Sequence, residues 1–530
     1  MMKRLLLSVV LFCSAYLLNA KNYDILQYGA VADTTVLSTK AIQMAIDQCT
    51  LTGGKVVIPS GSYKTGTLYL KNRVTLNLEK GAILYGSGQL KDYPENLPEY
   101  TFFRKGSVKR ALIYAEKCTD IAIDGEGTID GRGACFLVPK GSKVDSYTVR
   151  PYLIWMIQCT NVRTEGVRLR NSGLWMQHYL ACDNLYIHNI NVFNHSNKNN
   201  DMMDIDGCRD VRITDCTGDS DDDGITFKST SERANENIVV SNCILSSHCN
   251  ALKMGTESNT GFKNIAISNI MIRPSVVTDR SMEGTPKGHT GIALEMVDGG
   301  ILDGVVISNV SIDGPVCPIF IRLGNRARPI NPEKKVIQVG SLQNVRISNV
   351  QAKNALSACS ITGIPGYPVK NITLSNISIE FAGGGTNQFY DKAIPEKENA
   401  YPEFDMFDEL PCYGFFVRHG ENLRFTDIQL STKSEDERPA IVLSDLLFSD
   451  FRNMWIESIP KGICSVKAED CKGIIFSGNR VKGKTNCFLS LKGNNNNDIS
   501  IVGNVLNNSR LIFKTDPNIT VNVNESGNIK

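Results

Sequence analysis

The chain lacks a dominant charge, long apolar stretches and low-complexity blocks. It has 530 residues, with 57 Lys and Arg against 55 Asp and Glu, so its formal net charge is only +2. No overall field therefore favours nucleic acid or a membrane surface, although basic residues can still be local. Beyond the first twenty residues no apolar run has the length of a membrane span. We expect no nucleic-acid partner, no membrane span and no linker between domains.

The first twenty residues have the pattern of a signal peptide. Lys3 and Arg4 precede a mostly apolar run, and Ala20 is a small residue at the expected cleavage position. We expect a mature protein that is periplasmic or secreted, that forms one domain over residues 21–530, and that is a monomer.

The cysteines are numerous but lack the spacing of a metal cluster. There are 16, and no two form a CxxC pair. Cys216 and Cys243 occupy the same place in neighbouring repeats, which is typical of small inward-packed residues. We expect mostly free, buried thiols and no metal bound by them.

A short strand pattern repeats along the chain. Examples are IHNINV (187–192), VRITDCT (211–217), IVVSNCI (238–244) and IAISNIMI (265–272). Each alternates apolar and polar residues, which is the period of a strand with one buried face. A turn-forming Asn, Asp or Gly recurs at 189, 215, 242, 269, 309, 349, 376, 427, 478 and 503. Stacked coils bury such strands where a lone strand cannot, so we expect an all-β, single-stranded right-handed parallel β-helix.

The spacing of the turn residue predicts where loops are inserted. The first intervals are 26, 27 and 27 residues; the two of 40 indicate a coil with a loop, and the two of 51 indicate two coils. Large loops are expected at 274–291, 325–340, 353–370 and 383–413. Residues 38–50 have apolar positions at helical spacing, with Ser38 as a candidate N-cap and two glycines after them. This helix is expected to cover the open N-terminal end of the β-helix, which protects its strand edges.

The most informative segment, 199–229, is rich in aspartate. Asp201 and Asp222 are 21 residues apart, close to one coil, so Asp201, Asp222 and Asp223 are expected to lie on one face. Neighbouring carboxylates resist joint ionisation, so one can stay protonated as an acid while another acts as a base, as glycoside hydrolysis requires. Asp204 and Asp206 are interpreted as solvent-facing or turn-capping, and Asp210 and Asp215 as turn residues. Asp221 to Asp223 alone also suits a turn or a calcium site.

The chain resembles glycoside hydrolase family 28, the polygalacturonase family. The similar motifs are YDILQYGAVAD (23–33), GGKVVIPSGSY (53–63) and IDGEGTIDGRG (123–133). The family motif N-T-D-x-x-D is matched by Asn199, Asn200, Asp201 and Asp204, with Asn in place of Thr. Its D-D-C-I motif is matched by Asp222, Asp223, Gly224 and Ile225, with Gly in place of Cys.

The resemblance implies a role for each aspartate. Asp222 would be the general acid, and Asp201 and Asp223 would activate the attacking water. The anomeric centre would be inverted in one displacement, and no metal or other cofactor is expected. Asn199, within the first motif, is expected to contact the substrate.

The sequence departs from the family at two further motifs. Asn250 stands where the family has the His of G-H-G, with His248 two residues earlier. Ala293 and Glu295 stand in the places of the Arg and Lys of R-I-K, which contact the substrate carboxylate. Lys228 and Lys253 are candidate replacements from neighbouring coils, with surface lysine as the competing interpretation. Glu257 and Glu295 are candidates for contacts with sugar hydroxyls.

Trp175 and His178 lie one coil before Asp201, in a stretch resembling the family's W-x-x-H substrate segment. A Trp ring offers a flat face to a sugar, and a core Trp is the alternative. His178 is expected either to bond a hydroxyl or to fill a turn.

Three classes of function fit these patterns. The first is an inverting hydrolase of a pectic or related acidic polysaccharide. The second is a polysaccharide lyase acting on a uronate chain, since parallel β-helices also host lyases. The third is a β-helix that only binds glycans. The carboxylate spacing favours the first. Basic and histidine residues in or near the predicted loops suggest a pocket for an acidic chain end, and hence exo-action: Arg280, Lys287, His289, Arg322, Arg326 and Arg328.

Overall fold

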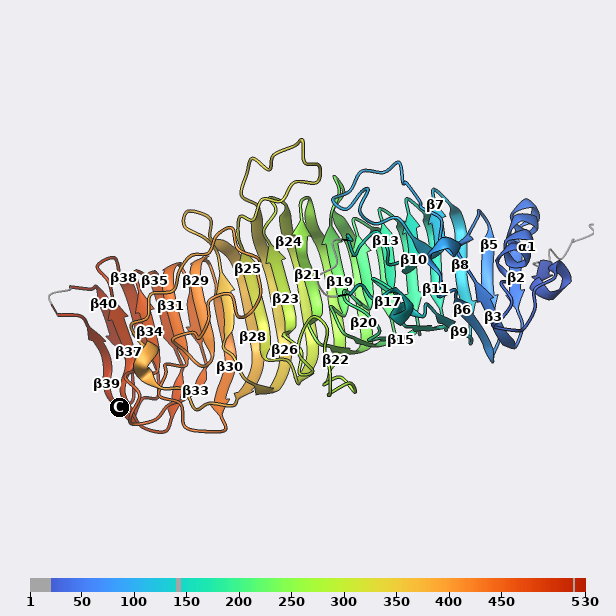
Figure 1. The fold of residues 1–530 in the computed structure, drawn as a ribbon. Coiled ribbons are helices and arrows are strands. Elements are labelled where there is room, and N and C mark those ends of the chain that lie inside the picture. Colours follow the sequence, from blue (N-terminus) through green and yellow to red (C-terminus); the bar gives the residue numbers. More distant parts are fainter. Residues whose placement is uncertain (1–20, 140–143, 518–519) are drawn as a thin grey trace, which may run out of the picture.

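The protein folds into one long parallel β-helix, seen here in a computed structural model that describes residues 21–139, 144–517 and 520–530. The predicted signal peptide lies outside the described residues. Within the described ranges the strands join one another only in parallel register, coil upon coil (Figure 1). The expected right-handed parallel β-helix is confirmed. No helix in the described part of the chain is long and apolar enough to span a membrane.

Each coil contributes strands to three parallel sheets. The first sheet contains β4 (Leu68–Tyr69), β7 (Ala111–Glu116), β10 (Tyr152–Ile157), β13 (Gln177–Leu180), β16 (Met203–Asp206), β19 (Ile225–Ser229), β21 (Asn250–Ser258), β23 (Thr290–Met296), β25 (Cys317–Leu323), β27 (Cys359–Thr362), β29 (Phe415–Glu421), β31 (Ile441–Leu447), β34 (Val466–Glu469), β37 (Thr485–Lys492) and β39 (Ser509–Thr515).

The second sheet contains β1 (Lys21–Asp24), β2 (Gly54–Ile58), β5 (Val74–Leu78), β8 (Thr119–Gly125), β11 (Thr160–Glu165), β14 (Asp183–His188), β17 (Arg209–Thr214), β32 (Asp450–Arg452), β35 (Lys472–Ser477), β38 (Asn497–Val502) and β40 (Val523–Ser526). The third contains β3 (Gly61–Thr65), β6 (Ala82–Gly86), β9 (Thr128–Asp130), β12 (Arg168–Arg170), β15 (Asn191–Asn194), β18 (Thr217–Ser220), β33 (Trp455–Glu457) and β36 (Arg480–Lys482). Longer strands run through both: β20 (Asn235–Ser247), β22 (Gly261–Ile272), β24 (Ile301–Asp313), β26 (Ser341–Ala355), β28 (Val369–Phe381) and β30 (Arg424–Thr432).

The turn column lies where the second sheet bends into the third. Asn242, Asn269 and Asn309 have φ of 57°, 58° and 57°, a left-handed conformation that Asn tolerates. The Asn269 side-chain amide donates to Asn242 Oδ1 at 3.1 Å, and Asn309 donates to Asn269 Oδ1 at 3.1 Å. The side-chain amides of the recurring turn residue therefore form a ladder, which keeps successive coils in register.

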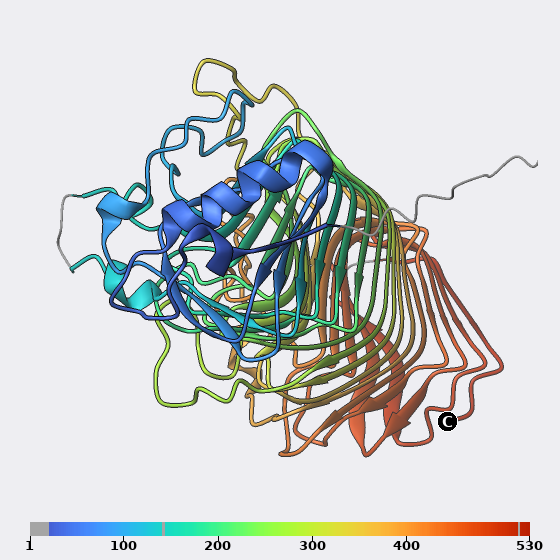
Figure 2. The same cartoon turned by 90° about the vertical axis from the view of Figure 1, so that its right-hand side faces the viewer.

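The predicted capping helix is α1, Thr39–Thr52, and it lies across the open N-terminal end (Figure 2). Ile42, Ala45 and Ile46 of α1 are fully buried against the first coil. Ser38 occupies the N-cap position without capping the helix, because its hydroxyl bonds to the backbone of Val31 instead. The cysteines at 49 and beyond are all free, and all but Cys135 are buried, as expected.

The loops are only partly as predicted. Long connections at 273–289, 324–340 and 382–414 match, but 353–370 contains β27 and only short turns, so that prediction is wrong. The interval from 376 to 427 holds one coil with the 382–414 loop, not two coils. Two long connections, at 87–110 and 131–151, were missed because they precede the regular repeat of the turn residue. Figure 1 shows long blue and yellow connections projecting from one edge of the β-helix.

Candidate active site

Three aspartates stand at the turn that leads into the first sheet. Asp201 lies two residues before β16, and Asp222 and Asp223 lie just before β19. Because Met203 of β16 pairs with Ile225 of β19, Asp201 is level with Asp223 on the next coil. The repeat therefore brings the three carboxylates to one edge of the first sheet, as their spacing predicts.

Asp223 is held by the following coil. Its Oδ1 accepts hydrogen bonds from the Asn250 backbone at 3.1 Å and from the Asn250 side-chain amide at 2.9 Å. Lys253 Nζ lies 3.1 Å from its Oδ2. Burial acts to raise the pKa of Asp223, but the charges of Lys253 and Lys228 and these hydrogen bonds hold it below its usual value. The carboxylate is therefore ionised at neutral pH.

Asp222 differs from its neighbour in both exposure and charge. It is partly exposed, whereas Asp223 is buried. Its Oδ1 accepts from the Asp223 backbone at 2.8 Å, and its Oδ2 accepts from the Asn199 amide at 3.4 Å. Burial and then the adjacent Asp223 charge raise the pKa of Asp222 to about 7. Two adjacent carboxyls thus differ in proton affinity, which is the condition for an acid and a base in one site.

Asp201 and Asp204 form a second, deeper pair. Both are buried, and burial raises the pKa of each well above its ordinary value. Lys228 Nζ lies 3.9 Å from Asp201 Oδ2 and 3.5 Å from Asp204 Oδ1. The expectation that Asp204 and Asp206 face solvent or cap a turn is wrong. Loops cover this face of the first sheet, and Asp206 is buried, accepting from Thr230 and bonding His178.

Lys228 and Lys253, for which surface lysine was one interpretation, are buried at 5% and 3% exposure. Besides the aspartates, Lys228 Nζ lies 3.6 Å from Glu257 Oε2. Lys253 Nζ lies 3.9 Å from Glu295 Oε2 and 3.8 Å from Glu403 Oε1. Each ammonium group therefore compensates the charge of several carboxylates. Charged groups of either sign are tolerated in a buried place only when they are paired in this way.

Trp175 and His178 both lie beneath the surface of the site. Trp175 stacks on Tyr152 at a centroid distance of 5.4 Å, and Lys228 Nζ lies 4.7 Å from its ring centroid. The ring therefore supports Lys228 by a cation–π contact rather than presenting a bare face to a sugar. His178 is in strand β13, not in a turn, and its Nε2 lies 3.1 Å from Asp206 Oδ2.

Five long connections place side chains around these residues. Arg104, Arg150, Arg328 and Glu403 come from four of them, and Met282 comes from the fifth. Arg104 lies 4.0 Å and Arg328 3.0 Å from Glu257 Oε1, and Arg150 donates to Asn199 Oδ1 at 3.0 Å. The Asn250 amide donates to Glu403 Oε1 at 3.4 Å. The repeat pattern contained no signal for Arg104 or Arg150, because their connections precede it. It predicted the loop that carries Glu403, but not where that side chain would lie.

The basic and histidine residues of the predicted loops divide into three groups. Arg328 and His289 reach the site, since His289 Nδ1 lies 3.6 Å from Glu403. Arg322 and Arg326 are used internally: Arg322 donates to the Glu396 carbonyl at 2.8 Å, and Arg326 pairs with Asp298. Arg280 and Lys287 line cavities outside the site.

Comparison with known proteins places the chain in a family. The model of glycosyl hydrolases family 28 matches residues 50–397, which includes the three aspartates and four of the five long connections around them. The chain belongs to glycosyl hydrolase family 28. It is therefore a glycoside hydrolase, and its substrate is a polysaccharide or oligosaccharide.

Individual relatives agree with this assignment. A probable polygalacturonase from Vitis vinifera is 26% identical over 392 residues, covering 70% of this chain and 76% of the relative. An exo-poly-alpha-D-galacturonosidase from Dickeya chrysanthemi is 42% identical over 120 residues, 21% of this chain and 20% of that protein. The crystal structure of a hyperthermoactive exopolygalacturonase from Thermotoga maritima superposes with a TM-score of 0.60 at 19% identity, covering 78% of this chain and 92% of that one, and shows the shared fold.

The departures from the family pattern are real features of the site. Asn250, which stands where the resemblance places the family's His, is on the coil after Asp223, and its amide donates to Asp223 Oδ1. His248 does not replace the missing His, because its ring bonds to Asp221 and Val277, away from Asp223. Ala293 and Glu295 lie on β23, the next strand of the first sheet, and both are fully buried.

Replacing Lys228 by Met should destabilise this family 28 enzyme by about 3–5 kcal/mol, the usual cost of leaving buried charges uncompensated. Asp201, Asp204 and Glu257 would lose their shared ammonium. Urea unfolding of wild type and variant measures the difference, with Lys263→Met, an exposed lysine on β22, as the matched control. Equal midpoints for wild type and Lys228→Met would contradict the charge arrangement described here.

Proposed function

We propose that the protein is an inverting hydrolase that removes sugars from the end of a pectic or related acidic polysaccharide. The observation that carries the proposal is the placement of Asp222 beside Asp201 and Asp223 at one edge of the first sheet. Inverting hydrolysis needs one carboxyl to protonate the leaving oxygen and another to activate water on the opposite face of the sugar.

The geometry supports a distinct role for each aspartate. Asp222 is the general acid, because it is the partly exposed member and its Oδ2 contacts only the amide of Asn199 among the described residues. Asp223, held by Asn250 and Lys253, stays oriented as a base. Asp201 helps to hold the attacking water beside Asp223; its Oδ1 is buried without a protein partner, which leaves an acceptor for that water.

The substrate class follows from the relatives and from the charges. Polygalacturonases and an exo-poly-alpha-D-galacturonosidase are among the similar proteins. In place of the family's Arg and Lys, this chain offers Lys228 and Lys253 from neighbouring coils. We propose that these ammonium groups, with Asn199 and Asn250, contact the sugar that is cleaved, and that Glu257 and Glu295 accept from its hydroxyls. Trp175 and His178 act indirectly, through Lys228 and Asp206.

Exo-action is supported by the five connections around the site. An open groove needs only short connections, whereas here residues from positions as distant as 104 and 403 lie around the same few side chains. Connections that surround the site in this way leave room for the end of a polysaccharide chain rather than for a chain that passes through.

Pectic polysaccharide lies outside cells, so the enzyme must be exported to reach it. Residues 1–20 have the pattern of a signal peptide, which would direct this export. We propose that the mature protein is a periplasmic or secreted monomer comprising residues 21–530 as one domain.

Asp222→Asn should abolish turnover, and Asp201→Asn and Asp223→Asn should each reduce it at least about a hundredfold, the usual scale for a positioned acid or base. Asn250→Ala should be milder, because the amide only orients Asp223. Release of reducing ends from pectic fragments measures these rates, with Asp210→Asn, an exposed turn residue, as the control. A near-normal rate in any of the three aspartate variants would move the active site elsewhere.

Time-resolved product analysis should show early release of a single small sugar from a pectic fragment, with little loss of viscosity. A terminus held in a walled pocket is cut one unit at a time. A ladder of intermediate oligosaccharides with a rapid fall in viscosity would rule exo-action out. Unsaturated products that absorb in the ultraviolet would instead indicate a lyase, and no products at all a binding protein.

A further inference from the structure

A buried cluster of two histidines and two aspartates lies behind Asp222. His195 follows β15, Asp219 is in β18, Asp221 follows β18, and His248 follows β20, so the cluster spans three successive coils. All four residues are at most 7% exposed. None of them belongs to the set assigned above to acid–base chemistry, and the following proposal is independent of that function.

The outer ring nitrogens of both histidines are hydrogen-bond donors. His195 Nε2 lies 2.7 Å from Asp219 Oδ1, and a carboxylate only accepts. Asp219 is itself fixed by the Ser275 hydroxyl at 2.7 Å. His248 Nε2 lies 2.9 Å from the Val277 carbonyl oxygen, which also only accepts. In the neutral rings the proton is therefore on Nε2, and Nδ1 of each ring is a bare lone pair.

Both of these lone pairs face the same carboxylate. His248 Nδ1 lies 3.0 Å, and His195 Nδ1 3.6 Å, from Asp221 Oδ1. His195 Nδ1 is buried and has no hydrogen-bond partner. Two lone pairs and a carboxylate oxygen that converge in a buried place repel one another unless positive charge lies between them. That charge is either a proton on each ring or a metal ion.

We propose that His195 Nδ1, His248 Nδ1 and the Asp221 carboxylate bind a divalent transition-metal ion of the zinc type. The three ligand atoms lie within 4.8 Å of one another. Ligands about 2.0–2.1 Å from a tetrahedral zinc are about 3.3 Å apart, and the two distances to Asp221 bracket that spacing. Two imidazoles and one carboxylate suit zinc and its neighbours rather than calcium, which prefers oxygen ligands.

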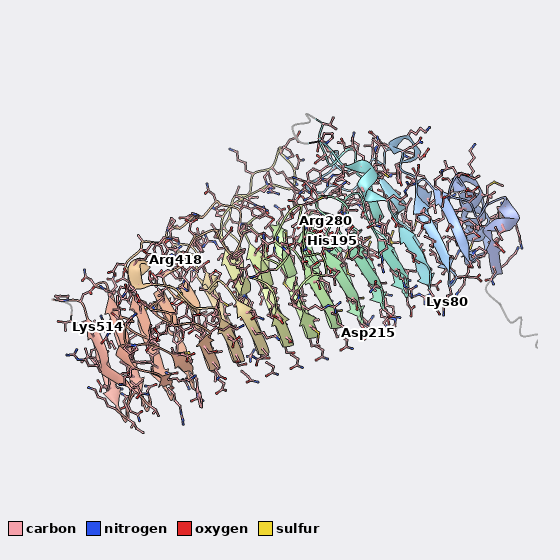
Figure 3. All side chains as sticks on the ribbon, turned by 60° about the horizontal axis from the view of Figure 1, so that its bottom comes forward. Lys80, His195, Asp215, Arg280, Arg418 and Lys514 are labelled. Atoms are coloured by element: carbon pink, nitrogen blue, oxygen red, sulfur yellow. The ribbon has the colours of Figure 1, made fainter. Side chains whose placement is uncertain are left out.

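The surroundings match those of protein metal centres. Histidines that bind metals commonly donate their other N–H to a carboxylate or a carbonyl, and here Asp219 and the Val277 carbonyl take those two roles. His195 also lines a cavity of about 580 Å³, together with Arg280, beside which it lies in Figure 3. The cavity reaches one member of the cluster and so offers an ion a path toward it.

The ion would fasten the 273–289 connection to the turn that carries Asp222. Asp221 accepts from the Met282 backbone at 2.9 Å and from the Glu283 backbone at 3.1 Å, and Asp219 accepts from the Val276 backbone at 2.9 Å. With His248 bonded to Val277, the cluster holds this connection near its start and at its middle. The proposed ion is therefore a positioning element for one wall of the site and does not touch the sugar.

Elemental analysis of protein purified without a metal-affinity step should find about one equivalent of zinc or a similar metal per chain. Dialysis against a chelator should remove it and lower the melting temperature, and zinc chloride alone should restore the melting temperature where calcium chloride does not. Cobalt added to the stripped protein should give the intense visible absorption of a four- or five-coordinate site. His248→Gln and Asp221→Asn should lose this absorption.

His188→Gln is the matched control, because His188 also lies between two acids, Glu165 and Asp215, but on the open surface and without a second histidine. It should retain the metal. Wild-type protein that binds no metal, gains no thermal stability from zinc and gives no cobalt spectrum would overturn the proposal and assign the positive charge to protons on both rings. Because Asp222→Asn tests catalysis separately, that result would leave the proposed hydrolase function unaffected.

Discussion

The strands of each coil pair with the strands of the coil before it and the coil after it, and this constraint positions the side chains of the site. Residues that occupy the same place in successive coils become neighbours in space, whatever their separation in the chain. The Asn269 column at the bend between sheets keeps the register, because a one-residue slip would turn apolar side chains outward. The same register sets Asp201 level with Asp223 and sets Asn250 beside it. The placement of the three aspartates proposed for catalysis is thus a consequence of coil length.

The second constraint is electrostatic. A face that carries several buried carboxylates is stable only if cations are buried with it, and Lys228 and Lys253 serve that purpose in two adjacent strands. The two aspartates that neighbour these lysines differ in proton affinity. The charges of Lys253 and Lys228 keep Asp223 ionised, whereas burial and the charge of Asp223 raise the pKa of Asp222. In the function proposed here, the same two lysines both contact the substrate and stabilise the fold.

The repeat made the fold and the placement of the three aspartates predictable, since both follow from periodicity. The loop side chains and the contacts that they make do not follow the periodicity, and they were not predictable. Arg104 and Glu403 come from loops whose paths depend on tertiary packing. Asp204 alternates with apolar residues like a solvent-facing residue, yet it is fully buried beside Lys228. Trp175 was expected to offer its ring to a sugar or to the core, and its cation–π partner Lys228 is visible only in three dimensions. Likewise, the cluster of His195, Asp221 and His248 joins residues from three coils that share no motif.

In the proposed mechanism water attacks directly, activated by one carboxylate while Asp222 protonates the leaving oxygen. Proton NMR of the first-formed product, recorded before mutarotation, tests this mechanism most directly. The newly formed reducing sugar should first appear with the anomeric configuration opposite to that of the bond that was cleaved. A product that first appears with the original configuration would contradict the mechanism, because it would require a covalent intermediate and a different arrangement of carboxylates.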